Sequence, residues 1–374
     1  MSIKKTKYDS YCLNGVAKGC EYCVKGEKLV LFMTGICKRG CWYCSLSKKR
    51  KNQNLIFANE RECKNFEDIL KEVKESNATS AGITGGDPLI FFERTIEFAT
   101  KLKKEFGEKF HIHIYLPTKL VTKEKLEKLS KCVDEVRFHP EFLIDNENPQ
   151  RVLHSSSNPT GSCIRTSGIH SSCNQTGSLS SSQMEDIEKI KLAEKIFGRK
   201  NIGIELPMIP EKKNKILDFI LNVEKNISFV NLNEFELSET NFDRITKNYT
   251  LKEGGYVVAG SLEAGKWILE ELTKTKSKLK VHMCTAELKN CSQFANRLKR
   301  HEILPYGKKT KEGTVIYLIS EGKLNLKGTY YDKDKKRTIL SEPTARKLLT
   351  KYKIKRVEEY PTYDRIEVEE EELN

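Results

Sequence analysis

The sequence predicts an α/β protein with a mostly parallel sheet. Short apolar runs alternate along the chain with longer segments of helical periodicity. Six such strand-then-helix units follow one another at the separations that crossover connections require, and the interval between the fourth and fifth strands is the longest. Successive units of this kind build a parallel sheet with right-handed crossovers.

The expected elements follow in a regular order. The apolar residues Phe66, Ile69, Leu70 and Val73 recur at i, i+3, i+4 and i+7, so they share one face of the first helix. The same patterns place strands within residues 28–35, 80–84, 111–116, 133–138, 202–206 and 229–237, and helices within 65–76, 93–106, 123–132, 184–197 and 213–225.

One interval departs from this spacing. Residues 153–183 are rich in Ser, Asn, Gly and Thr, so they cannot bury much apolar surface. We interpret them as an insertion after the fourth strand, either a disordered loop without a role or a lid that orders on substrate binding. The expected domain limits are 1–27 for a cysteine-rich N-terminal segment, 28–260 for the core and 261–374 for an α+β extension.

Composition indicates an intracellular enzyme. The 374 residues include 12 cysteines, which are clustered rather than spread as in a disulfide framework. The N-terminus lacks the apolar stretch of a signal peptide, and no apolar run reaches the length of about 18 residues that a membrane span needs. We therefore expect a cytoplasmic protein without a membrane partner. The net charge of +14 fits either solvated lysine-rich helix faces or an acidic partner such as RNA.

Cys37, Cys41 and Cys44 form a compact set of thiols directly after the first strand. Thiolate sulfur selects iron–sulfur clusters and other soft metals. Three thiolates are one fewer than a [4Fe–4S] cubane needs, so the fourth iron would be open to a small molecule. The alternatives are a zinc site, which needs a fourth ligand, or structural cysteines.

This loop, with Trp42 and Tyr43 before its third cysteine, resembles the signature loop of radical S-adenosylmethionine (radical SAM) enzymes. The resemblance implies a partial, six-stranded, TIM-like (β/α)6 barrel with its chemistry at the C-terminal strand ends. It also implies that Cys37, Cys41 and Cys44 are catalytic and hold a [4Fe–4S] cluster, that S-adenosylmethionine (SAM) chelates the open iron, and that Tyr43 touches the adenine.

A second motif, Gly85, Gly86, Asp87 and Pro88, follows the second strand. It resembles the Gly-Gly-Glu-Pro segment of the family, whose backbone holds the methionine amino group of SAM. Two glycines at a strand end let the main chain approach a ligand closely. Because Asp87 replaces the family's glutamate, the resemblance implies a backbone role rather than a side-chain contact.

Polar residues near later strand ends complete the expected cofactor site. Arg137 and His139 end the fourth strand, where the family commonly has a ribose contact, so the resemblance implies that they bind the cofactor. In the sixth strand Asn231 and Asn233 share one face, and we assign Asn231 to cofactor binding. A buried strand with polar residues on both faces indicates either a water-filled cavity on one side or side chains that hydrogen-bond to one another.

A further cysteine set precedes the core. Cys20 and Cys23 have the spacing of a metal knuckle, and Cys12 offers a third thiolate. Cys284 is the candidate fourth ligand, with Cys291 and His282 as competitors. We expect a second [4Fe–4S] cluster or a structural zinc ion at Cys12, Cys20, Cys23 and Cys284, because four cysteines alone do not separate the two metals. The alternative is a redox dithiol or unused thiols.

The resemblance also implies an activity. An electron from a ferredoxin- or flavodoxin-type donor cleaves SAM to methionine and a 5′-deoxyadenosyl radical, which abstracts hydrogen from a substrate. A protein or peptide substrate, or an activase-type partner enzyme, is favoured, and tRNA or RNA modification is the alternative. A metal-cluster scaffold that binds RNA without catalysis is the non-enzymatic alternative.

Two segments extend the resemblance over most of the chain. Residues 12–23 and residues 358–367 are similar to an archaeal group described as related to pyruvate formate-lyase activating enzyme. This similarity implies a relationship to activating enzymes without identifying the substrate.

Overall fold

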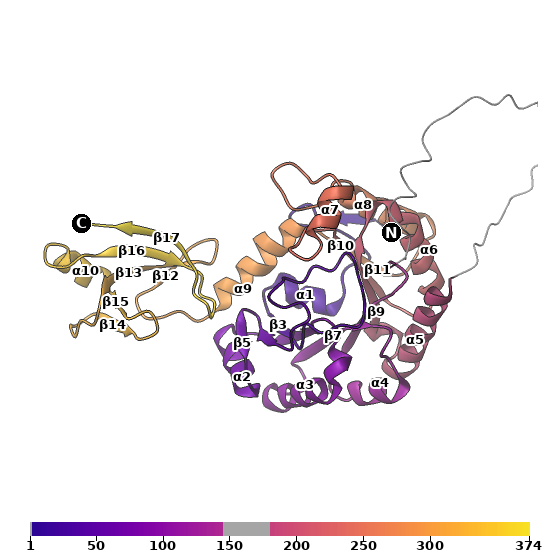
Figure 1. Ribbon diagram of the computed structural model, residues 1–374, viewed down its shortest axis with the longest axis horizontal. Helices are drawn as coiled ribbons and strands as arrows, with labels where there is room; N and C mark the ends of the chain where they lie inside the picture. Colours follow the sequence, from indigo (N-terminus) through magenta and orange to yellow (C-terminus); the bar gives the residue numbers. More distant parts are fainter. Residues whose placement is uncertain (1, 145–179) are drawn as a thin grey trace, which may run out of the picture.

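A curved, largely parallel sheet dominates the computed structural model, which describes residues 2–144 and 180–374 (Figure 1). In the described residues, seven parallel strands stand in the order β11-β10-β9-β8-β7-β6-β3. Their bounds are Lys28–Phe32 (β3), Ser80–Thr84 (β6), His111–Pro117 (β7), Glu135–His139 (β8), Ile202–Met208 (β9), Phe229–Glu234 (β10) and Lys280–Cys284 (β11).

Antiparallel strands extend both ends of this sheet. A hairpin pairs with β3 at one end, and two short N-terminal strands pair with β11 at the other. These strands are Ile56–Ala58 (β4), Arg61–Cys63 (β5), Ile3–Lys5 (β1) and Tyr11–Leu13 (β2). Because β1 and β5 end the strand order without pairing to each other, the barrel is open. The expected partial TIM-like α/β barrel is confirmed, with seven parallel strands rather than six.

Helices cover the outside of the sheet (Figure 1). The apolar side chains of the parallel strands face these helices and form the main core, whereas the side chains that face the interior are mostly polar. The helices are Phe66–Glu75 (α2), Phe92–Phe106 (α3), Lys123–Leu129 (α4), Ser181–Phe197 (α5), Lys213–Val223 (α6), Phe242–Asn248 (α7) and Ser261–Lys274 (α8). Short 3-10 turns precede α3, β9 and α6 at Pro88–Phe91 (η1), Arg199–Asn201 (η3) and Pro210–Lys212 (η4).

Local sequence explains how these helices begin. The side chain of Asn65 accepts a hydrogen bond from the backbone N–H of Asp68 and caps α2. Ser180 and Gln183 form a reciprocal capping box at the start of α5. Each cap satisfies backbone donors that the first helical turn leaves free.

One helix lies inside the barrel instead of on its surface. Helix α1, Lys18–Val24, occupies the centre of the ring in Figure 1. A side chain added at Gly19 would place its Cβ 2.6 Å from Arg137 Nη2 and 2.6 Å from His113 Nδ1, two side chains on neighbouring barrel strands. Glycine is therefore required where α1 approaches these strands.

The C-terminal part forms a separate antiparallel sheet, reached through a π-helix, Leu288–Phe294 (η5), and helix Ala295–Arg300 (α9) (Figure 1). Its elements are Lys308–Lys309 (β12), Val315–Glu321 (β13), Thr329–Asp332 (β14), Arg337–Leu340 (β15), Glu342–Leu348 (α10), Lys355–Glu359 (β16) and Glu367–Glu372 (β17).

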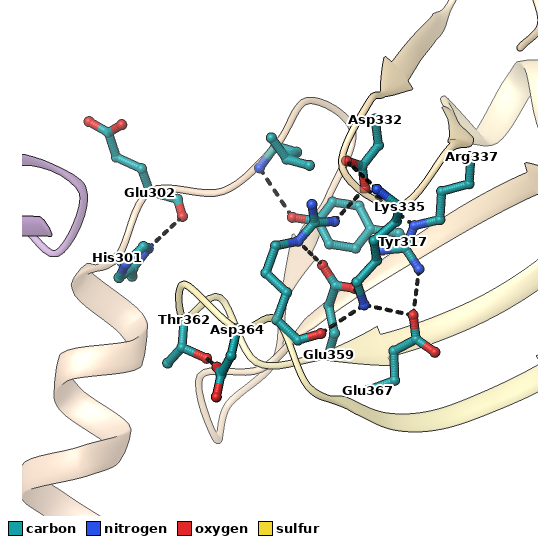
Figure 2. Close-up of polar contacts among 12 residues, drawn as sticks. His301, Glu302, Tyr317, Asp332, Lys335, Arg337, Glu359, Thr362, Asp364 and Glu367 are labelled. Atoms are coloured by element: carbon teal, nitrogen blue, oxygen red, sulfur yellow. Dashed lines mark hydrogen bonds and ion pairs between the residues drawn. The ribbon is translucent and has the colours of Figure 1, made fainter. Parts of the chain in front are cut away.

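A network of buried charges stabilises this sheet (Figure 2). Arg337 pairs with Asp332, Glu359 and Glu367, and Lys335 pairs with Glu359 and Glu367. Glu359 is 1% exposed. Burying these charges is tolerated because each one has opposite charges beside it.

Three expectations differ from the observed fold. Strand β11 and the N-terminal strand β2 belong to the barrel sheet, so the sheet extends beyond the expected core limits of 28–260 at both ends. Cys20 and Cys23 lie on helix α1 and not on a metal-knuckle turn. Most of the expected insertion at 153–183 lies outside the described residues, and its last residues begin α5.

Candidate active site

The three closely spaced cysteines lie at the C-terminal ends of the parallel strands. Their loop follows β3, and Cys37, Cys41 and Cys44 all line a cavity of about 560 Å³. Strands β3, β6, β7, β8, β9 and β10 or the loops after them supply the rest of the wall. The lining residues used below are Arg39, Tyr43, Lys51, Gly85, Gly86, Tyr115, His139, Glu205, Asn233, Glu234, Glu236, Thr240 and Lys289.

Two sides of the barrel hold the cysteine loop in place. On one side, the Arg39 guanidinium donates to the backbone carbonyls of His139 and Pro140 after β8. On the other side, the Thr240 hydroxyl lies 2.9 Å from the carbonyl oxygen of Cys44 and 2.7 Å from that of Leu46. The loop is thus anchored to both walls of the cavity.

An aromatic cluster packs against the same loop. The Trp42 ring stacks on Tyr249 with an interplanar angle of 10° and meets Phe235 edge-on. The Arg244 guanidinium lies over the Trp42 ring, 4.6 Å from the ring centroid. Tyr43 lines the cavity, and its expected contact with the adenine stays a prediction. Burial raises the pKa of Tyr43, so its hydroxyl stays protonated.

Three thiolates on one cavity-lining loop fit an iron–sulfur cluster. In a cubane each thiolate binds a different iron, so three thiolates would leave one iron without a protein ligand. Burial raises the pKa of Cys37 and of Cys41, and metal binding must therefore displace their protons.

The glycine pair after β6 contacts the start of this loop. The Gly86 N–H lies 2.6 Å from the carbonyl oxygen of Thr34, and the Asp87 N–H lies 3.0 Å from that of Ile36. A Cβ on Gly86 would stand 2.4 Å from the Ile36 oxygen, and Gly85 has a φ of 145°. Only glycine permits this approach of two backbones.

Asp87 and Pro88 have a different role from the glycines. They are not among the cavity-lining residues. The Asp87 carboxylate accepts a hydrogen bond of 2.9 Å from the Leu89 N–H and caps the short turn η1, in which Pro88 is the first residue. The Asp87 side chain thus has a local capping role, and the expected contact of Asp87 and Pro88 with the cofactor stays a prediction.

Of the two residues expected on β8, only His139 lines the cavity. Its ring lies 5.6 Å from that of Tyr115, centroid to centroid. Burial lowers the pKa of His139 to about 4, so the imidazole is neutral near pH 7. A neutral imidazole can donate one hydrogen bond and accept another, as ribose recognition requires.

Arg137 lies below the cavity and does not face it. Its Nη1 is 3.0 Å from Glu205 Oε2, and its Nε donates to Glu135 over 2.7 Å. Asn231 is also below the cavity, where its side chain contacts Cys20 and His282. Both residues thus have side-chain partners in the barrel interior, and the expected contact of Arg137 and Asn231 with the cofactor stays a prediction.

The floor of the cavity contains residues that sequence patterns signalled only weakly. Glu205 accepts a hydrogen bond of 2.8 Å from Asn233, and both side chains line the cavity. Burial raises the pKa of Glu205, but Arg137 and His139 outweigh it and hold the pKa below its usual value. The polar alternation along β10 pointed to Asn233, whereas Tyr115 and Lys289 gave no signal in the sequence.

The second cysteine set gathers in the barrel interior. Cys12 on β2, Cys20 and Cys23 on α1, and Cys284 at the end of β11 all come from elements that meet there. We call these four residues the interior cysteines. Burial raises the pKa of Cys20 to about 11 and that of Cys284 to about 12, so both are thiols when no metal is bound. The competitor Cys291 is exposed.

The fold and the site define a class: barrel enzymes that hold an iron–sulfur cluster on a three-cysteine loop at the barrel mouth. The model of the radical SAM superfamily matches residues 31–151. A protein of Methanocaldococcus jannaschii named "Putative glycyl-radical enzyme activating enzyme" is 32% identical over 316 residues, which cover 83% of this chain and 75% of that protein. The chain belongs to the radical SAM superfamily, as the cysteine loop predicted.

Solved structures of the superfamily are also similar. The radical SAM methyltransferase TsrM of Kitasatospora setae, with cobalamin and a [4Fe–4S] cluster bound, matches with 10% identity and a TM-score of 0.36 over 77% of this chain. Coproporphyrinogen III oxidase (HemN) of Escherichia coli matches with 12% identity and a TM-score of 0.36 over 69%. The chain covers 54% and 56% of these two proteins.

Family membership settles several expectations. The chain is an enzyme, which rules out the non-enzymatic scaffold hypothesis, and the family implies a [4Fe–4S] cluster and SAM as cofactors.

Among helices of the described residues, none has both the length and the apolar character needed to cross a bilayer.

Proposed function

We propose that this radical SAM enzyme abstracts a hydrogen atom from a protein substrate, as an activase does for a partner enzyme that carries a glycyl radical. The similarity to a protein named as a glycyl-radical enzyme activating enzyme carries this proposal. A glycyl radical forms when one hydrogen atom leaves a glycine Cα, so the substrate would be a peptide loop presented to the barrel mouth.

The charge balance of the cavity supports a peptide over RNA. Its lining includes three cations, Arg39, Lys51 and Lys289, and three carboxylates, Glu205, Glu234 and Glu236. Lys289 is ion-paired with Glu236. RNA recognition relies on an excess of basic over acidic groups near the phosphates, and the cavity lining has no such excess. Two residues of the basic run 48–51 already have partners within the protein. Arg50 lies over the Phe57 ring, and Lys49 forms an ion pair with Glu62.

The residues of this chain would divide the work as follows. Cys37, Cys41 and Cys44 would hold the cluster, which when bound supplies the electron for reductive cleavage of SAM to methionine and a 5′-deoxyadenosyl radical. The backbone of Gly85 and Gly86 and the Tyr43 ring would orient SAM. Neutral His139 would hold a ribose hydroxyl, and the walls would exclude water from the radical. A reduced ferredoxin- or flavodoxin-type protein would supply the electron.

The first experiment tests the chemistry alone. Anaerobically reconstituted protein with dithionite and SAM should release 5′-deoxyadenosine, measured by liquid chromatography, and Cys37→Ala should release none. Wild-type protein that loads its cluster and still makes no 5′-deoxyadenosine would contradict the proposal.

The second experiment tests the substrate class. A glycyl-radical enzyme encoded in the same genome, with glycine deuterated at Cα, should transfer deuterium into 5′-deoxyadenosine and develop the doublet signal of a glycyl radical in electron paramagnetic resonance. Transfer from RNA and not from the protein would favour the RNA alternative. Dependence on a protein donor is tested by replacing dithionite with reduced flavodoxin.

A further inference from the structure

The interior cysteines come from two distant parts of the chain, residues 12–23 and Cys284. In the barrel sheet Cys12 is in register with His282, and Cys284 is in register with Asn233 on β10. Residues in register on adjacent strands point to the same face, so Cys12 and Cys284 occupy neighbouring layers of the interior. Cys20 and Cys23, three residues apart on α1, lie on one face of that helix.

Side-chain contacts show how close these residues come. Cys23 Sγ is 2.9 Å from Gln293 Oε1, and Gln293 Nε2 is 3.5 Å from Cys284 Sγ, so a single amide group spans the two sulfurs. Cys20 Sγ is 3.7 Å from Asn231 Oδ1, the atom that also contacts His282 beside Cys12. These contacts place the sulfurs of Cys20, Cys23 and Cys284 in one region of the barrel interior.

Two of these sulfurs, those of Cys20 and Cys284, accept hydrogen bonds of the kind that metal-bound thiolates accept. The Arg137 Nη1 lies 3.3 Å from Cys20 Sγ, and the Gln293 amide donates to Cys284. Hydrogen bonds and positive charge near ligand sulfurs stabilise an anionic cluster. Cys12, Cys20 and Cys284 are each less than 10% exposed, and all four interior cysteines are free thiols.

The separation of two of the sulfurs fits a cluster. The Gln293 amide lies between Cys23 Sγ and Cys284 Sγ, whereas two thiolates on one tetrahedral zinc ion stand about 3.8 Å apart. Thiolates that each bind a different iron stand farther apart.

We propose that Cys12, Cys20, Cys23 and Cys284 bind a second iron–sulfur cluster in the barrel interior, directly beneath the cavity. Arg137 bridges the two sites, since it contacts both Cys20 and the cavity-lining Glu205. The Gln293 amide, which comes from the π-helix η5, would move aside on loading, and π-helical segments are often found at functional sites. This proposal does not depend on the identity of the substrate.

The test removes the first cluster and asks whether iron remains. The variant Cys37→Ala/Cys41→Ala/Cys44→Ala keeps the interior cysteines native and is reconstituted anaerobically with ferrous iron and sulfide. It should retain about four irons and about four sulfides per chain, with the Mössbauer signature of a cubane. Retention of no iron, or of stoichiometric zinc in place of iron in protein as isolated, would overturn the proposal.

A second set of variants assigns the remaining iron. Adding Cys20→Ser and Cys23→Ser to the triple variant should abolish the retained iron, whereas adding Cys63→Ser and Cys132→Ser, two buried cysteines elsewhere in the core, should leave it unchanged. Iron that persists after Cys20→Ser and Cys23→Ser would also overturn the proposal. Circular dichroism of each variant checks that the barrel has folded, and the first variant remains decisive if the second does not fold.

Discussion

Arg137 offers a direct test of the charge arrangement beneath the cavity. Its side chain is 2% exposed and contacts two carboxylates, Glu135 and Glu205, which are themselves buried. Arg137→Met preserves most of the volume but leaves both carboxylates without their cation. Removing one partner of a buried ion pair costs about 3–5 kcal/mol, a large part of the roughly 5–15 kcal/mol that stabilises a typical protein.

The pH dependence distinguishes this mechanism from simple loss of packing. In the native protein the folded-state pKa of Glu205 is depressed, so its stabilisation is present above the unfolded-state pKa and is lost as pH falls through the folded value. In Arg137→Met burial would raise that pKa, so the penalty would be largest at high pH and would shrink as pH falls and the carboxyl protonates. The difference in stability between the two proteins should therefore increase from about pH 5 to about pH 8.

Urea unfolding followed by tryptophan fluorescence measures this difference. Both tryptophans, Trp42 and Trp267, belong to the barrel, so the C-terminal sheet does not contribute to the signal. The control is Arg199→Met, an exposed arginine whose loss should change the unfolding free energy by less than about 0.5 kcal/mol. A deficit below about 1 kcal/mol for Arg137→Met, or one equal at both pH values, would refute the reasoning.

Three further predictions concern the loop and the C-terminal sheet. Gly86→Ala places a methyl group 2.4 Å from the Ile36 oxygen, so it should cost about 1–3 kcal/mol and reduce 5′-deoxyadenosine formation, measured by liquid chromatography. Thr240→Val removes the one hydroxyl donor that two loop carbonyls share, worth about 0.5–1.5 kcal/mol in total, and should speed amide hydrogen exchange in the loop. Glu359→Gln should destabilise the C-terminal sheet by about 3–5 kcal/mol, seen by calorimetry, without shifting the tryptophan transition.

Each of these variants has a matched control. Gly255→Ala alters an exposed loop residue whose added Cβ would stand at least 3.5 Å from its neighbours, so activity should be kept. Thr246→Val removes a hydroxyl on exposed helix α7, and Glu371→Gln alters an exposed strand residue. Equal effects in a variant and its control would contradict the corresponding prediction.

Local patterns were sufficient for the elements that make the site. The Cys37, Cys41 and Cys44 spacing and the two glycines after β6 are contiguous in sequence, and their chemistry does not depend on distant partners. The periodicity of the outer helices predicted their positions within a few residues, because each helix buries one apolar face against the sheet.

Contacts between distant segments could not be predicted in the same way. Arg137 ends a strand at a position typical of a ligand contact, yet its direction depends on Glu135 in the same strand and on Glu205 in the next. The interior position of α1 likewise depends on the small size of Gly19. The sequence does not reveal this requirement, because it arises only from the packing of α1 against β7 and β8. Cys284 was predicted as the fourth ligand beside Cys12, Cys20 and Cys23, which stays a prediction, and its strand, placed outside the expected core limits, pairs with β10 of the barrel.

The position of α1 has a consequence for how the chain folds. Ser10, made early in synthesis, bonds to His282, 272 residues later. Closing a loop of that length costs on the order of 5 kcal/mol in chain entropy. Residues on the N-terminal side of the barrel can therefore complete their contacts only after residue 282 has been synthesised, so the barrel interior stays incomplete until then.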